Sequence, residues 1–279
     1  MDILVKMLKT NLLTATIIGL CLTNINTALG VTVSVGEGNK PNVSDTLAPF
    51  NKNAVASFSE GVNLYKQGDL KGSEAAFRKA IELQPNFAKA YIGLGNTLDD
   101  QGKPTEAIAQ YKKAISLEPK ESGAYFNLGL TLARLNKLDD AIAQYQKAIS
   151  LNPKYVSAHY NLASALYDQE KLTEAVAEYT ETIRLDPKYV QAYNGLGNAL
   201  DDQGKPTEAI AQYKKAISLD PKNGYAYYNL AVTLGRQQQL DDAIVALKKA
   251  KELFQIQRNS KMLEKVDQLF QKINTRQIN

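Results

Sequence analysis

A repeat of 34 residues constrains this chain more than any other feature of its sequence. From Ala54 onward, six consecutive units of that length align on a proline near the end of each one, or on Gln255 in the last. Repeats of this length are typical of chains built as a row of small units, each of which buries its apolar surface against its neighbours. We therefore expect an array of units around no single central core. The units span 54–87, 88–121, 122–155, 156–189, 190–223 and 224–257.

Three columns of the alignment indicate how the units pack. The eighth position is Gly or Ala in every unit, and the twentieth is Ser or Ala. Because Gly inside a helix costs about 1 kcal/mol relative to Ala, the glycines of the eighth column require an offsetting gain, which close contact between helices supplies. The large residue at position 24 is expected to fill the space between neighbouring units. The residues at position 24 are Phe77, Tyr111, Tyr145, Tyr179, Tyr213 and Leu247.

Each unit has the pattern of two amphipathic helices. In the second unit, apolar residues recur at helical spacing both around Leu94 and around Ile108. Between the two halves lies a position where Gly can adopt the left-handed conformation that ends a helix. Glu170 and Gln238 occupy this position in the fourth and sixth units, and we expect them to adopt that conformation less readily. The glycines at this position are Gly68, Gly102 and Gly204.

These patterns predict an all-α fold, a right-handed helical solenoid of six helix-turn-helix repeats with a C-terminal capping helix over 258–279. Asn259 is the expected N-cap of the capping helix. Its apolar face would close the sixth repeat, although an amphipathic helix left free for a membrane or a partner is the alternative. The residues of that face are Met262, Leu263, Val266, Leu269, Phe270 and Ile273.

The sequence also repeats over a longer period of three units, or 102 residues. The second and fifth units differ at only 6 of 34 positions, and the third and sixth units also correspond. A block of three units has therefore been duplicated. Two of the six differences, Lys89 to Gln191 and Ile92 to Asn194, fall on the first helix of the unit. Either local tuning or drift explains them.

The repeat pattern resembles the tetratricopeptide repeat family from Ala54 to about Ile256. The resemblance implies that the first helices line a concave groove in which an extended peptide or another protein element docks. It also implies that positions 2, 5, 6, 9, 12 and 13 of each repeat face the partner. Asn amides there can bond a peptide backbone, and Tyr offers rigid anchors. Carried over position by position, the implied groove residues are Lys89, Ile92, Asn96, Asp99, Phe126, Asn127, Leu130, Arg134, Tyr160, Asn161, Ser164, Tyr167, Asn194, Asn198, Asp201, Tyr228, Asn229 and Arg236.

No catalytic motif, phosphate-binding loop or metal-ligand cluster is recognisable in the sequence. His159, the one histidine, stands where other units carry Tyr, so it is interpreted as a packing residue. The basic pair Lys112-Lys113 is assigned to a solvated outer face, and a net charge of +4 spread along the chain gives no argument for nucleic acid. Acidic pairs that recur with the repeat are interpreted as solvated helix ends or caps. These are Asp99-Asp100, Asp139-Asp140, Asp201-Asp202 and Asp241-Asp242.

The sequence therefore predicts a scaffold or adaptor without enzymatic activity, cofactor, metal or small-molecule substrate, which binds a protein or an extended peptide. Two alternatives remain open: a structural array that self-associates, and a membrane-anchored assembly factor.

The N-terminal segment 1–30 has the layout of a secretory signal peptide. Lys6 and Lys9 precede an apolar run from Leu12 to Leu22, eleven residues long. That run is shorter than the roughly 18 to 20 residues with which a helix crosses a bilayer. We expect cleavage near Gly30, export to the periplasm or outside the cell, and a role in envelope assembly or secretion. An uncleaved anchor is the alternative, and 31–53 is expected to be a flexible linker.

Overall fold

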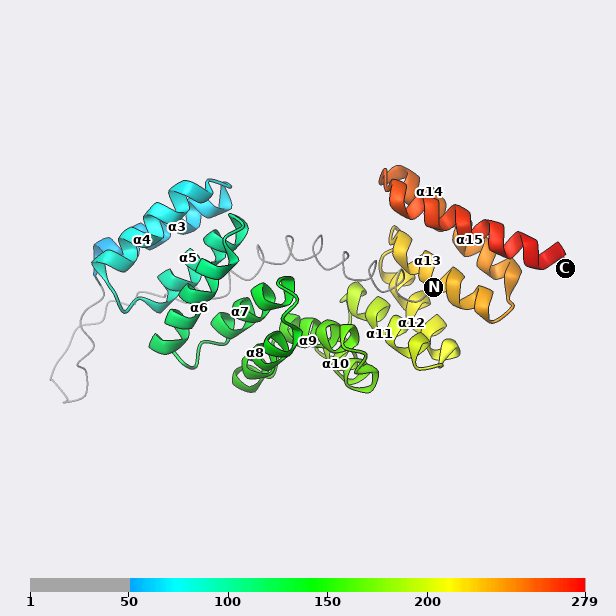
Figure 1. Ribbon diagram of the computed structural model, residues 1–279, viewed down its shortest axis with the longest axis horizontal. Coiled ribbons are helices and arrows are strands. Elements are labelled where there is room, and N and C mark those ends of the chain that lie inside the picture. Colours follow the sequence, from blue (N-terminus) through cyan, green and yellow to red (C-terminus); the bar gives the residue numbers. More distant parts are fainter. Residues whose placement is uncertain (1–50, 279) are drawn as a thin grey trace, which may run out of the picture. The chain divides into compact units, whose positions relative to one another are not determined.

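The structure, a computed structural model, describes residues 51–278. The expected signal peptide, and the expected linker up to residue 50, lie outside the described residues. Within 51–278 the chain forms thirteen α-helices and no strand (Figure 1). The first helix begins at Lys52, with the side chain of Asn51 accepting a hydrogen bond from the backbone of Asn53 at 2.9 Å. The predicted linker boundary at residue 53 was therefore two residues too late.

Each 34-residue unit contains two helices. The first helices are α3 (Lys52–Lys66), α5 (Ala88–Asp100), α7 (Ser122–Arg134), α9 (Val156–Asp168), α11 (Val190–Asp202) and α13 (Gly224–Arg236). The second helices are α4 (Leu70–Leu83), α6 (Pro104–Leu117), α8 (Leu138–Leu151), α10 (Leu172–Leu185), α12 (Pro206–Leu219) and α14 (Leu240–Ile256). The last helix is α15 (Ser260–Ile278).

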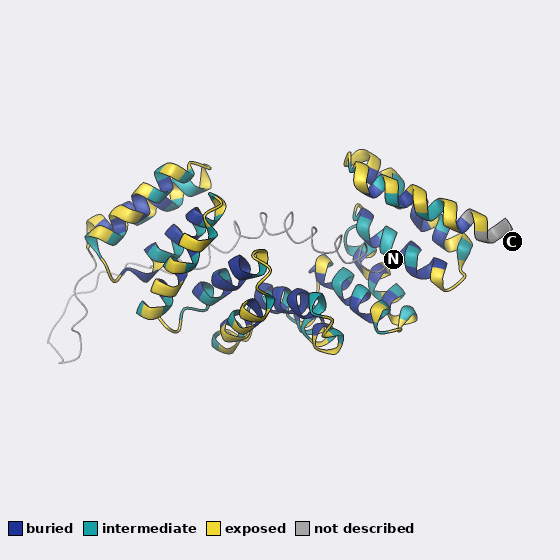
Figure 2. Cartoon of the chain, in the orientation of Figure 1, coloured by how far each residue is buried: buried dark blue, intermediate teal, exposed yellow. Residues whose placement is uncertain are grey.

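The described helices fall into two compact units, α3–α7 and α8–α15. Within each unit, every helix packs against the next one along the chain, as α3 and α4 do in Figure 1. The first helices of neighbouring repeats also touch: α5 contacts α3 and α7 in one unit, and α11 contacts α9 and α13 in the other. Most helices are buried on one side and exposed on the other (Figure 2). The predicted all-α helical repeat fold is confirmed.

The small residues of the eighth column make room for the ring at position 24. A Cβ atom added to Gly95 would lie 2.5 Å from Cε1 of Tyr111 in the same repeat, far inside van der Waals contact. The ring at position 24 also reaches the next repeat, since a Cβ on Gly93 would lie 2.5 Å from Cζ of Phe77. The residue at position 24 was expected to fill the space between neighbouring repeats, and the structure shows that it also lies between the two helices of its own repeat.

The turn between the two helices keeps one geometry even where Gly is absent. Glu170 and Gln238 both have φ of 61°, close to the 57° of Asn136, so both adopt the left-handed conformation although their intrinsic preference for it is lower. The backbone N–H groups of Glu170 and Lys171 donate to carbonyls at the end of α9 at 2.9 Å, in the pattern that Gly68 makes at the end of α3. These hydrogen bonds and the packing of the two helices offset a left-handed cost of roughly 1–2 kcal/mol.

The terminal helix α15 packs against α14 and α13. Its predicted N-cap is confirmed, because Asn259 Oδ1 accepts a hydrogen bond from the backbone N–H of Met262 at 3.1 Å. Met262, Val266 and Ile273 are buried, so the apolar face is used in packing. Among the helices that the structure describes, none combines the length and the apolar character that crossing a membrane requires.

A hydrogen bond joins successive repeats, from the side chain at position 4 of one repeat to the backbone carbonyl of the proline near the end of the preceding repeat. The hydroxyls of Tyr91, Tyr125 and Tyr193 each donate to such a carbonyl at 3.1–3.2 Å. His159 takes the same role, with Nε2 lying 3.1 Å from the Pro153 carbonyl oxygen.

His159 has a second partner that the tyrosines lack. Its Nδ1 lies 2.6 Å from Oε2 of Glu178, and both partners of the ring are acceptors. Only the imidazolium has two N–H groups, so only the protonated ring can donate to both. Burial opposes protonation, but the hydrogen bonds to Glu178 and to the Pro153 carbonyl outweigh it and raise the pKa of His159 above 6.5.

Replacing His159 by Tyr should remove a pH-dependent part of the stability. A base whose pKa is raised on folding stabilises the fold fully below its unfolded pKa, and loses that contribution as the pH rises through its folded pKa. We expect the free energy of unfolding of the native chain, relative to His159→Tyr, to decrease between pH 5.5 and pH 8.5. Urea titrations of both proteins measure this difference, and a difference that does not change with pH would contradict the assignment.

Candidate functional site

The first helices of the unit α3–α7 carry a network of amides. Asn96 on α5 accepts two hydrogen bonds at its Oδ1, one from the Tyr111 hydroxyl at 2.9 Å and one from Asn127 Nδ2 on α7 at 3.0 Å. Because both neighbours donate to this oxygen, the orientation of each amide is fixed. Among the residues that the structure describes, no group bonds Asn96 Nδ2 or Asn127 Oδ1. The network thus leaves one donor and one acceptor on two half-buried side chains.

A layer of charged and hydroxyl groups lies beside the amides. Asp99 pairs with the guanidinium of Arg134 and accepts a hydrogen bond from the Thr131 hydroxyl at 3.0 Å. Burial raises the pKa of Asp99, and Arg134 and Thr131 oppose this effect. The Tyr65 hydroxyl on α3 donates to the next carboxylate, Asp100. These bonds join α3, α5 and α7.

The unit α8–α15 repeats this arrangement on α9, α11 and α13. Asn198 Oδ1 accepts from the Tyr213 hydroxyl at 2.9 Å and from Asn229 Nδ2 at 3.0 Å. Arg236 pairs with Asp201 at 2.7 Å. Burial raises the pKa of Tyr213, which keeps its hydroxyl protonated as a donor. In addition, the Tyr167 hydroxyl donates to Asp202.

We call these two surfaces the N-terminal site and the C-terminal site. The N-terminal site comprises Phe58, Tyr65, Ile92, Asn96, Asp99, Asn127 and Arg134. The C-terminal site comprises Tyr160, Tyr167, Asn194, Asn198, Asp201, Asn229 and Arg236.

Most of the sequence-predicted groove residues are exposed or half-buried on the first helices. Those in the unit α3–α7 are Lys89, Ile92, Asn96, Asp99, Asn127 and Arg134. Those in the unit α8–α15 are Tyr160, Tyr167, Asn194, Asn198, Asp201, Tyr228, Asn229 and Arg236.

Four predicted groove residues are buried, and we correct their assignment as partner contacts. Phe126 and Leu130 are each 7% exposed, so these side chains are used in packing. Asn161 donates from Nδ2 to the Ser157 carbonyl at 2.8 Å, within its own helix. Ser164 bonds the Tyr160 carbonyl oxygen and lies 3.1 Å from the Tyr179 hydroxyl. Repeat position alone did not reveal this burial, because it depends on the residues packed against each helix.

Sequence reasoning missed the hydroxyl donors Tyr65, Tyr111 and Tyr213. It also described Asp99-Asp100 and Asp201-Asp202 only as solvated helix ends or caps. Both pairs do lie at the ends of first helices, but they also bond residues on neighbouring first helices. A usable signal was present in the spacing: an Arg follows the first Asp of each pair after 35 residues, at Arg134 and Arg236. The remaining acidic pairs, Asp139-Asp140 and Asp241-Asp242, lie in the first turns of α8 and α14.

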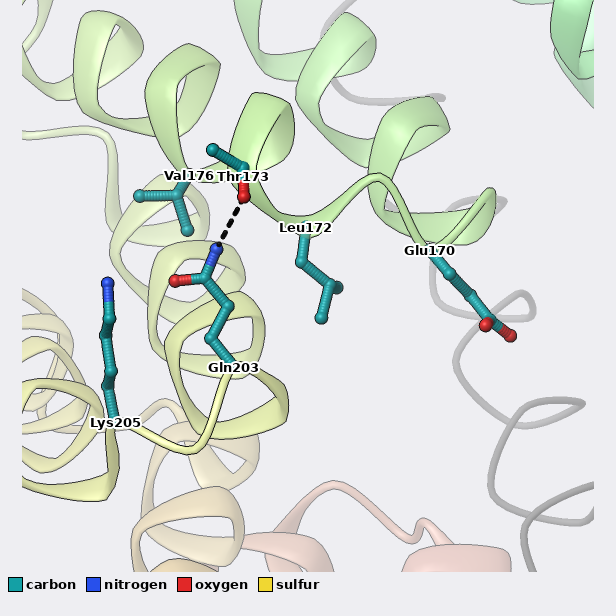
Figure 3. A pocket seen from close by; sticks show the side chains of 6 residues that line it. All are labelled: Glu170, Leu172, Thr173, Val176, Gln203 and Lys205. Carbon is teal, nitrogen blue, oxygen red and sulfur yellow. Dashed lines mark hydrogen bonds between the residues drawn. The ribbon is translucent and has the colours of Figure 1, made fainter.

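A hollow of about 490 Å³ lies away from these surfaces, between the start of α10 and the turn after α11 (Figure 3). Gln203 Nε2 lies 3.5 Å from the Thr173 hydroxyl, while Glu170 and Lys205 lie at opposite ends of the view in Figure 3. Within residues 51–278, no group of three or more His, Cys, Asp or Glu side chains is placed to hold a metal ion.

The helix pairs recur every 34 residues, and each pair packs against the next one along the chain within its unit. Polar contacts also join the first helices of neighbouring repeats. This arrangement defines a helical repeat protein. Family models agree with this class along most of the chain, and the chain belongs to the tetratricopeptide repeat family. Models described as "Tetratricopeptide repeat" or "TPR repeat" match residues 58–124, 92–155, 126–190, 178–211, 197–238 and 224–256.

Solved structures of this family resemble the chain. A crystal structure of MamA is 31% identical over 58% of this chain and 95% of that chain, with a TM-score of 0.55. YrrB, described as "a TPR protein with an unusual peptide-binding site", is 26% identical over 64% of this chain and 92% of that chain, with a TM-score of 0.57. PilF of Pseudomonas aeruginosa, at 18% identity over 73% of this chain and 92% of that chain, shares the fold with a TM-score of 0.65. No curated protein matches the chain significantly.

Proposed function

We propose that this protein is a non-enzymatic scaffold or adaptor that binds an extended segment of a partner protein along its first helices. The amide pairs carry this proposal. Each pair combines one fixed Asn whose Nδ2 is unused with a second Asn, from the next repeat, whose Oδ1 is unused. A peptide backbone offers one C=O and one N–H per residue, which is the complementary set.

The chemistry of both sites favours binding over catalysis. The carboxylates of Asp99 and Asp201 are held by arginines, and the Tyr65 and Tyr167 hydroxyls donate to carboxylates. In these contacts the charged and hydroxyl groups join neighbouring first helices, which is a structural role. The description of the similar protein YrrB as having a peptide-binding site supports the same function.

Removing the unused acceptor of each pair should weaken peptide binding. In Asn127→Ala with Asn229→Ala, Asn96 and Asn198 keep their bonds from Tyr111 and Tyr213, so the fold should persist. Loss of about one hydrogen bond per site, worth roughly 1 kcal/mol, should weaken binding of a peptide selected from a random phage-displayed library about five- to tenfold. Isothermal titration calorimetry measures this change.

The matched control is Lys112→Ala with Lys113→Ala on the exposed face of α6. This variant should bind the same peptide as the native chain does. Equal affinity of the Asn variant and the native chain, or a loss confined to the Lys variant, would refute binding along the first helices.

The setting that we propose is the cell envelope or the exterior, in envelope assembly or secretion. The layout of residues 1–30, with Lys6 and Lys9 before the apolar run, supports this setting. Intact mass of the protein isolated from its own cells should show a chain that begins near Val31. A mature chain that keeps residues 1–30 would contradict cleavage.

A further inference from the structure

The two sites are related by the duplication of three repeats. Each residue of the N-terminal site has a counterpart 102 residues later in the C-terminal site, as Asn96 has Asn198. The amide pair and the Tyr–Asp hydrogen bond recur with the same atoms as partners. The Asp–Arg pair also recurs, through the other carboxylate oxygen and the other terminal guanidinium nitrogen. Both sites therefore present one backbone-binding frame.

An aromatic cluster underlies each site with the same geometry. The Phe58 ring centroid lies 5.7 Å from that of Phe77 and 5.0 Å from that of Phe87. The corresponding distances from Tyr160 are 5.9 Å to Tyr179 and 4.9 Å to Tyr189. The interplanar angles also agree, at 55° and 40° in the first cluster against 56° and 38° in the second.

The two clusters differ in chemistry. All three rings are Phe in the N-terminal site and Tyr in the C-terminal site, although the first and fourth repeats differ at most of their positions. Two neighbours change in the same direction. Val62 corresponds to Ser164, whose hydroxyl lies 3.1 Å from that of Tyr179, and Ile92 corresponds to Asn194. The C-terminal site is thus the polar version of the N-terminal site.

Two polar atoms lack a partner here, one on Asn194 in the C-terminal site and one on Tyr189 in the aromatic cluster that underlies it. Among the described residues, none bonds the Tyr189 hydroxyl or Asn194 Oδ1, and both atoms are buried. The Tyr189 side chain belongs to a residue only 8% exposed. Leaving such a group unpaired destabilises the fold, and a ligand that supplies the missing hydrogen bonds removes this penalty. The counterparts Phe87 and Ile92 have no polar side-chain atom, so no unpaired group arises at these two positions.

We infer that the partner presents two extended segments with different anchoring side chains, one for each site. The N-terminal site takes an aliphatic or aromatic anchor against the half-buried side chains of Phe58 and Ile92. The C-terminal site takes a carboxamide, Asn or Gln, whose NH₂ donates to Asn194 Oδ1 and whose C=O accepts from the Tyr189 hydroxyl. This inference rests on the proposed function, since both segments use the same amide pairs for their backbones.

Exchanging the contrasting residues between the sites tests this inference. Tyr189→Phe with Asn194→Ile replaces the two residues that carry unpaired polar atoms by their counterparts Phe87 and Ile92. The full chain and this variant are used to select peptides from a random dodecapeptide phage library, and the selected peptides are titrated by calorimetry. The native chain should select two classes, one with an apolar anchor and one with an Asn or Gln anchor, each binding at one site per chain.

The exchange should weaken the Asn or Gln class at least tenfold and should raise the stoichiometry of the apolar class from one to two. The reciprocal variant, Phe87→Tyr with Ile92→Asn, should do the opposite, and it provides the same test if the first variant does not fold. If the native chain selects peptides but the exchanges leave both classes unchanged, the inference is wrong. If the native chain selects no peptide, the proposed function itself fails.

Discussion

The contact between a tyrosine ring and a glycine backbone is the interaction on which this structure depends. The ring at position 24 lies so close to the eighth position of its own repeat that a Cβ on Gly95 or Gly197 would overlap it. A glycine destabilises its helix relative to alanine, and the buried ring offsets this loss by packing against two helices at once. Because Phe77 also lies against Gly93 and Tyr179 against Gly195 in the next repeat, the residue at position 24 contributes both to the spacing within a repeat and to the stacking between repeats.

The same ring connects the fold to the function. The Tyr111 hydroxyl emerges from the packed core next to Gly95 and donates to Asn96, and Tyr213 does the same for Asn198. A packing residue therefore fixes the orientation of an amide at the surface. Preorganised polar groups lose less entropy on binding, so a peptide backbone that meets this amide binds with more of the hydrogen-bond energy retained. In the first repeat position 24 is Phe77, which has no hydroxyl. Position 9, which holds Asn96 and Asn198 in the second and fifth repeats, is Val62 there. The amide and the hydroxyl that orients it are therefore absent together.

The fold was predictable from the sequence because its determinants are local and repeated. The period, the small residues of the eighth column and the amphipathic halves each specify one helix pair, and the N-cap Asn259 was identified correctly. The site was predictable only as a set of positions. The burial of Phe126 and Asn161 depends on residues packed from other helices, and the bond between Tyr111 and Asn96 joins two helices of one repeat. Glu170 adopts the left-handed conformation, which the sequence indicated as less favourable for Glu than for Gly, because the hydrogen bonds at the end of α9 outweigh its intrinsic preference.

The affinity of a selected peptide for Tyr111→Phe with Tyr213→Phe tests most directly whether the core positions the binding amides. The substitution keeps both rings against Gly95 and Gly197 and removes only the two hydroxyls. We predict an unfolding midpoint within a few degrees of the native value and a peptide affinity weakened severalfold, because Asn96 and Asn198 each lose one of the two hydrogen bonds that fix their orientation. A peptide affinity equal to that of the native chain would contradict the account.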